Sequence, residues 1–122
     1  MSSLTFLFVF ISVFLSVVAQ ILLKHGMSNS AVQNALNSDA LTAGITIVTN
    51  MSVVAGLIAY VSSASLWLIV LSKIDVSKAY PFVGLGFIGT MMFAYWFLNE
   101  PLTLIKVMGT LLIVAGVLLI SQ

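Results

Sequence analysis

Residues 4–23 read LTFLFVFISVFLSVVAQILL, twenty residues without a charge, and Lys24 follows directly. A hydrocarbon core about 30 Å thick is crossed by about 20 apolar residues of α-helix. Within lipid, only helices and closed barrels satisfy their own backbone hydrogen bonds. Because this run is continuously apolar rather than alternating, it predicts a membrane-spanning helix.

The same pattern recurs three times, over residues 45–71, 79–98 and 102–120. The sequence therefore predicts an all-α membrane protein with four transmembrane helices in one domain, residues 1–122. Polar Asn50 leaves open a later start for the second helix, near Met51.

The connections differ in length. Residues 72–78 and 99–101 are short, and Pro101 suits the first turn of the fourth helix. Residues 25–44 form a longer connection, rich in Ser, Asn and Ala. Its core, residues 31–40, is consistent with a short amphipathic helix at the membrane interface, and a solvated loop is the alternative. The apolar positions of that helix are Ala31, Val32, Ala35 and Leu36.

The composition excludes several classes of protein. Hydrophobic residues make up 61% of the chain and charged residues 6%, against about 25% charged in soluble domains. A net charge of +1 does not provide the basic surface of a nucleic-acid-binding protein. With no cysteine, one histidine (His25) and no nucleotide-binding loop, we expect neither a cofactor, a metal site nor an enzyme.

The lysines leave the orientation in the membrane open. Lysine favours the cytoplasmic side, whereas carboxylates count for little. Lys73 and Lys78 are predicted on the side of both termini, and Lys24 and Lys106 on the opposite side. This tie predicts a weakly determined orientation, unless a partner or the first helix decides it.

Polar residues follow one face of the first helix. Ser12, Ser16, Gln20 and Lys24 are each four residues apart, a spacing that places them on one side. Such a stripe predicts one wall of a hydrophilic, substrate-binding cleft. In the alternative, the serines bond to their own backbone and Gln20 joins helices.

Further candidate site residues lie on the second and third helices. Tyr60, Ser63 and Trp67 share a face of the second helix, and Tyr80 opens the third. We predict that they contribute to substrate binding, with simple helix packing as the alternative.

Glycines mark two further features. Gly84 and Gly86 in the third helix predict a hinge, or else close packing against another helix. Gly109 and Gly116 are two turns apart on the fourth helix, which predicts a dimer interface.

Two charged residues near the start of the fourth helix are also candidates for substrate binding. Glu100 would stabilise the positive end of that helix and pair with Lys24 or Lys106. Lys106 lies more than a turn inside the apolar run, where it either extends to the interface or meets an anion.

Several motifs together resemble a known family. They are residues 15–24 (LSVVAQILLK), 64–81 (ASLWLIVLSKIDVSKAYP), 84–86 (GLG), 98–101 (LNEP) and 109–116, from Gly109 through Gly116. They resemble the small multidrug resistance fold of the drug/metabolite transporter superfamily. The resemblance covers nearly the whole chain, except the long first connection.

The resemblance divides into two branches. Proton-coupled drug exporters carry a glutamate in the first helix, where this chain has Ser16. Residues 16–24, 79–81 and 100–101 are instead similar to ArnE/ArnF-type subunits, which move aminoarabinose-phosphoundecaprenol across the inner membrane. The resemblance thus implies a flippase subunit of the bacterial inner membrane that works without an ATP motor.

Four short helices enclose little volume, so we expect a dimer with the substrate cavity between protomers. The partner is a second copy or a related four-helix subunit, and the substrate a polyprenyl-phosphate-linked sugar or similar anionic lipid. The alternatives are a multidrug-type exporter of small organic molecules and a non-transporting membrane subunit of a glycosyltransferase system.

Overall fold

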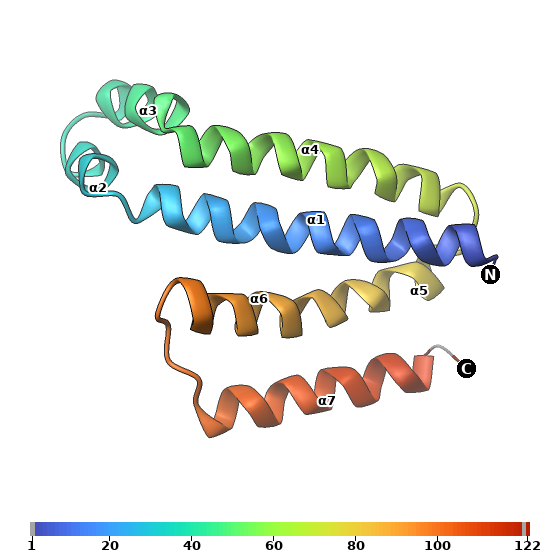
Figure 1. Cartoon of the computed structure of the whole chain (residues 1–122). Helices are drawn as coiled ribbons and strands as arrows, with labels where there is room; N and C mark the ends of the chain where they lie inside the picture. Colours follow the sequence, from blue (N-terminus) through green and yellow to red (C-terminus); the bar gives the residue numbers. More distant parts are fainter. Residues whose placement is uncertain (1, 121) are drawn as a thin grey trace.

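The computed structural model describes residues 2–120 and 122, and within them every regular element is a helix (Figure 1). The elements are α1 (Ser3–Met27), α2 (Ser30–Leu36), α3 (Ala40–Thr49), α4 (Met51–Leu71), α5 (Val76–Ala79), the 3₁₀ turn η1 (Tyr80–Phe82), α6 (Val83–Phe97) and α7 (Leu104–Ile120).

Three helical stretches are long and apolar enough to cross a bilayer: α1, α4 and the continuous run Val76–Phe97 that joins α5, η1 and α6. The apolar helix α7 has 17 residues, a rise of about 25 Å. That length lies at the short end of the range for transmembrane helices, about 17–25 residues.

The predicted second span, residues 45–71, begins too early, because the helix is interrupted at Asn50. The alternative start near Met51 is the observed one. Asn50 is extended (φ −73°, ψ 122°), and its side chain accepts a hydrogen bond from the backbone N–H of Val53 at 3.1 Å. Asparagine competes with the helical backbone in this way and therefore favours a cap over a helix interior. The break separates α3 from α4, so the transmembrane helix begins at Met51.

The predicted helix over residues 31–40 is shorter in the structure. It is α2, which is capped by Asn29 and ends at Leu36. Val32 and Ala35 are buried, whereas Ala31 and Leu36 are exposed. Two of the four apolar positions predicted for this helix are therefore buried.

The fourth helix begins later than predicted. Thr103 caps α7, since its hydroxyl accepts the backbone N–H of Lys106 at 3.2 Å. Pro101 lies before the helix rather than in its first turn, so that expectation was wrong. Asn99 has a φ of 55°, and the N–H of Glu100 donates to the carbonyl of Ala94 at 3.2 Å. This bond spans the left-handed Asn99 and closes the C-terminal end of α6.

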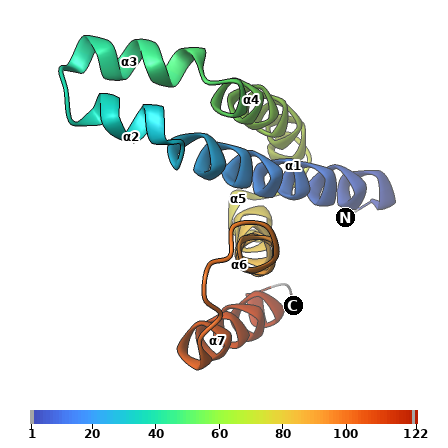
Figure 2. The ribbon, with the colours of Figure 1, turned by 60° about the vertical axis from the view of Figure 1, so that its left-hand side comes forward.

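The long helices lie side by side in the order α4, α1, α6, α7 (Figures 1 and 2). Helix α1 packs most extensively against α4 and less against α6, and α7 contacts α6 and η1. Both termini and α5 lie at one end, and the α2–α3 pair lies at the other (Figure 1).

Few side chains are fully buried, and the small core lies around Val9, Val70 and Ala79. Large apolar side chains instead cover the outside, as for Ile105, which is 82% exposed. An apolar exterior of this extent is matched to hydrocarbon rather than to water.

Candidate functional site

A groove of about 530 Å³ runs between α1, α4 and α6, and we call it the main groove. Its walls are formed by Ser12, Val13, Ser16, Val17, Gln20, Tyr60, Ser63, Ala64, Trp67, Tyr80, Val83, Gly86, Phe87 and Thr90. Seven of the ten residues predicted to bind substrate are among them. A few polar groups in a mostly apolar wall are typical of a ligand site.

The α1 stripe faces this groove, but its serines already donate hydrogen bonds. The Ser12 hydroxyl donates to the Ser63 carbonyl at 2.8 Å, and the Ser63 hydroxyl donates to the Ser12 carbonyl at 2.7 Å. Ser16 donates to the carbonyl of Val13 at 2.8 Å. These hydroxyl oxygens can still accept a hydrogen bond from a ligand.

Gln20 differs from these serines. It is exposed, and its side chain has no hydrogen-bond partner among the residues that the structure describes. Its amide offers two donors and an acceptor to a molecule in the main groove.

The aromatic residues complete the opposite walls. Tyr60 on α4 is 48% exposed and Tyr80 in η1 is 64% exposed, so both phenols are accessible. Trp67 is half-buried because it also packs against the core around Val9 and Val70. It therefore has a packing role alongside its place in the groove wall.

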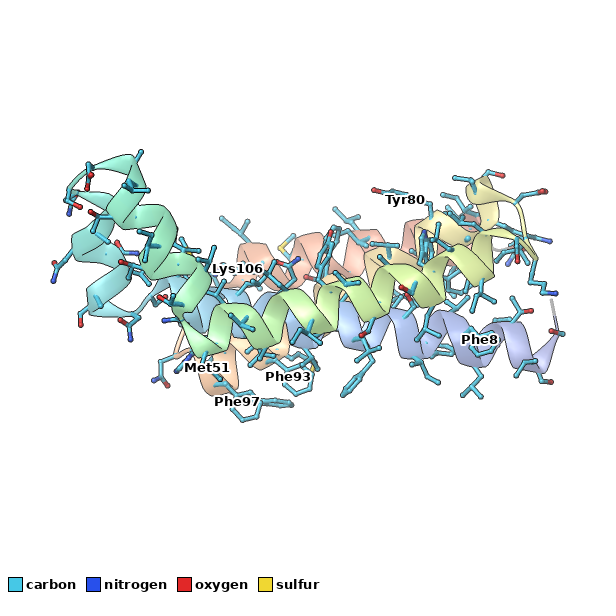
Figure 3. All side chains as sticks on the ribbon, turned by 90° about the horizontal axis from the view of Figure 1, so that it is seen from above. Phe8, Met51, Tyr80, Phe93, Phe97 and Lys106 are labelled. Carbon is cyan, nitrogen blue, oxygen red and sulfur yellow. The ribbon has the colours of Figure 1, made fainter. Side chains whose placement is uncertain are left out.

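A second groove, of about 380 Å³, lies between α6 and α7, and we call it the side groove. Its walls are formed by Phe87, Thr90, Met91, Ala94, Glu100, Pro101, Lys106, Thr110 and Ile113. Phe87 and Thr90 belong to both grooves, so the two adjoin across α6. Tyr80 and Lys106 lie toward opposite ends of the helices (Figure 3).

The expected ion pair of Glu100 is not formed within the described residues. The ammonium Nζ of Lys106 donates instead to the carbonyl of Pro101 at 2.8 Å. Glu100 is half-buried in the wall of the side groove, without a cation beside it.

Lys24 lines neither groove. It is exposed in the last turn of α1, one turn beyond Gln20, and thus lies past the end of the main groove. The structure therefore separates Lys24 from Lys106, although both were predicted to contribute to one substrate site.

The predicted hinge glycines are close-packing positions inside a continuous helix. A Cβ at Gly84 would lie 3.0 Å from the side chain of Ile113 on α7, and one at Gly86 would lie 3.2 Å from that of Val13 on α1. In contrast, Gly109 and Gly116 have open space around them.

Sequence reasoning missed two wall residues that join the grooves, Phe87 and Thr90. Thr90 is one turn from Gly86 and Phe87 is the next residue, and both line the main groove beside the face of α6 that packs against α1. Gly86 and Gly89, three residues apart, lie on one face of the helix. These glycines were the feature of the sequence that could have identified the face packed against α1.

Comparisons with known proteins agree on a transporter. The model of the EamA-like transporter family matches residues 2–122. A Photorhabdus laumondii protein named "Probable 4-amino-4-deoxy-L-arabinose-phosphoundecaprenol flippase subunit ArnF" is 36% identical over an alignment of 120 residues that covers 92% of each chain. Its namesake from Proteus mirabilis is also 36% identical, over 96% of this chain and 91% of its own.

A protein that carries the name of the other flippase subunit, ArnE, is similar to part of this chain. A Pseudomonas aeruginosa protein with the corresponding ArnE name is 38% identical over 56 residues, which cover 46% of this chain and 49% of its own. No solved structure gives a significant match.

Proposed function

This chain belongs to the EamA-like transporter family, and from that premise we propose that it is a subunit of a flippase for a polyprenyl-phosphate-linked sugar in the bacterial inner membrane. The names of its relatives support this substrate class. The observation that carries the proposal is the main groove, which places hydroxyl, amide and phenol groups inside an otherwise apolar helical protein.

The main groove and its surroundings offer a place for each of the three parts of such a substrate. The sugar hydroxyls bond to Ser16, Gln20 and the phenol of Tyr80, while the polyprenyl tail stays in the lipid around the helices. The phosphate meets the exposed Lys24, one turn beyond Gln20 and past the end of the groove, where an ammonium forms a charge-assisted bond with an anion. Lys106 lies apart from this position, in the side groove.

Transport through this site needs no motor within the chain. The substrate moves down its own gradient, and its consumption on the far side maintains that gradient. We propose that α7 crosses the membrane as the fourth span and that its face around Gly109 and Gly116 contacts a second subunit. That subunit is another copy or a related four-helix protein, and it closes the substrate cavity.

The test is lipid flipping in proteoliposomes. Purified protein, alone and with a related subunit, is reconstituted with a polyprenyl-phosphate amino sugar. A membrane-impermeant amine reagent then measures how fast the head group reaches the outer leaflet. We expect clear acceleration over empty vesicles.

A matched pair of variants tests the role of Lys24. Losing a charge-assisted bond costs about 1.5–3 kcal/mol, roughly ten- to a hundredfold in affinity. Lys24→Ala should therefore strongly slow flipping, whereas Lys73→Ala, at the other end of the molecule, should not. Equal rates for Lys24→Ala and the parent protein would contradict the phosphate-binding role.

A small-molecule exporter is the second candidate, with Glu100 as its coupling group. The half-buried position of Glu100 in the side groove favours it. Uptake of a quaternary ammonium dye driven by a pH gradient distinguishes the two. We expect none, because Ser16 occupies the position of the exporters' glutamate.

A further inference from the structure

The side groove contains two opposite charges that do not neutralise each other. Glu100 and Lys106 both line this groove of about 380 Å³, yet no ion pair forms between them. The Lys106 ammonium is held by the Pro101 carbonyl at 2.8 Å. The groove therefore offers a carboxylate and an ammonium in one wall, without an ion pair between them, and each can take a further partner.

The position of Glu100 is determined by the backbone. The left-handed residue Asn99 and the bond from the Glu100 N–H to the Ala94 carbonyl place it at the turn that ends α6. The turn fixes the backbone from which this carboxylate projects. This pre-organisation reduces the entropy lost when a ligand binds.

The surroundings of this carboxylate favour a cationic ligand. Glu100 is half-buried, and the adjoining wall contains Phe87, Met91 and Ile113. A charge partly removed from water is stabilised by an opposite charge, because the effective dielectric constant falls. No lysine of the described chain pairs with Glu100, so this carboxylate remains free to bind a cationic group in the groove.

A head group with an amine and a phosphate fits both charges. The amine, as an ammonium, pairs with Glu100, and the phosphate pairs with Lys106. The shared wall residues Phe87 and Thr90 connect this position with the main groove. A head group bound at the α6–α7 turn is thus next to the groove that the proposed transport uses.

We propose that the side groove is a head-group site at which Glu100 selects lipid-linked sugars that carry a free amine. Lys106 binds the phosphate of these lipids. This inference rests on the proposed function for the lipid class. It adds a second site and assigns the amine selectivity to one residue.

Equilibrium binding in detergent tests this independently of transport. The ligands are a short-chain polyprenyl-phosphate amino sugar and its N-acetylated counterpart, which has no charge on nitrogen. The parent protein should bind the free amine at least about tenfold more tightly, the effect of a charge-assisted bond. In Glu100→Gln that preference should vanish through loss of amine affinity, while the affinity for the N-acetylated lipid stays the same.

Asp75→Asn is the matched control, because Asp75 is an exposed carboxylate at the opposite end of the molecule. It should keep the full preference. An unchanged preference in Glu100→Gln overturns the proposal. An equal loss of affinity for both ligands also overturns it, because it indicates a structural role for Glu100. Should Glu100→Gln fail to fold, equal binding of the amine and a hydroxyl analogue by the parent protein overturns it.

A further arm distinguishes the source of the amine. Phosphatidylethanolamine also carries an amine and a phosphate, so it is added as a competitor in large excess. Weak competition supports an amino-sugar lipid, and competition at equal strength overturns the sugar selectivity. Tight, amine-dependent binding without flipping in proteoliposomes contradicts the proposed function but leaves this site standing.

Discussion

The interface between α1 and α4 is built differently from the interface between α6 and α7. Helices α1 and α4 touch through glycines and exchange two hydroxyl–carbonyl hydrogen bonds between Ser12 and Ser63. Between α6 and α7 one hydroxyl, that of Thr110, reaches the sulfur of Met91 at 3.4 Å, and a groove of about 380 Å³ stays open.

The difference follows from the lipid that surrounds the helices, which takes the place of water as their solvent. Lipid tails are as apolar as leucine, so no hydrophobic force drives helices together inside a bilayer. Close contact then depends on small residues and on hydrogen bonds between helices. The α1–α4 pair has both and forms a scaffold, whereas the α6–α7 pair has one glycine contact, Gly84 against Ile113, and one weak hydrogen bond, and leaves a groove open.

The largest predicted effect tests the close contact of α1 and α4. A Cβ at Gly26 would lie 2.6 Å from the side chain of Val53 and 2.9 Å from its backbone nitrogen. Gly26→Ala should therefore lower the free energy of unfolding by about 1–3 kcal/mol, measured by denaturant titration in detergent.

Gly44 on α3 is the control, because a Cβ there meets open space. Gly44→Ala should raise stability by about 0.5–1 kcal/mol, since alanine favours a helix. Equal effects at Gly26 and Gly44 would show that the α1–α4 interface adapts more readily than its packing suggests.

The second prediction concerns the open face of α7. Gly109→Leu and Gly116→Leu should leave the protomer folded, because a Cβ at either position would meet no other atom within 4 Å outside its own stretch of helix. Each should weaken the dimer by about tenfold, or 1.4 kcal/mol, measured by cross-linking over a range of protein-to-lipid ratios. Dimers of parental strength in both variants would place the interface elsewhere, and Gly44→Leu serves as the control.

A smaller effect is expected from the hydroxyls that join α1 and α4. Interhelical hydrogen bonds in membranes contribute about 0.6 kcal/mol on average. Ser12→Ala and Ser63→Ala each remove one hydroxyl–carbonyl bond, so each should lower the free energy of unfolding by about this amount, and the double variant by about the sum. No loss in any of the three variants would mean that the glycine contacts alone hold the two helices together.

The smallest effect should come from the matching change between α6 and α7. Thr110 also donates to the carbonyl of Lys106 in its own helix at 2.7 Å, so its contact with sulfur is secondary. Thr110→Val should alter stability by less than about 0.5 kcal/mol. A loss larger than that of Ser12→Ala would reverse the ranking of the two interfaces.

Local spacing predicted much of the main groove. Ser12, Ser16 and Gln20 share a helix face because a spacing of four returns to the same side, and all three line the groove. The break at Asn50 was recognised as an alternative only, because a capping asparagine and an exposed one look alike in sequence.

The sequence by itself determined that the chain is made of long apolar helices, because the length and continuity of each run meet the demand of a bilayer. Only the tertiary structure decided which residues meet. It pairs Ser12 with Ser63, places Gly26 against Val53, and sets Glu100 and Lys106 in a groove apart from Lys24. These outcomes depend on how helices pack, and a uniformly apolar surface has no periodicity that encodes its partner.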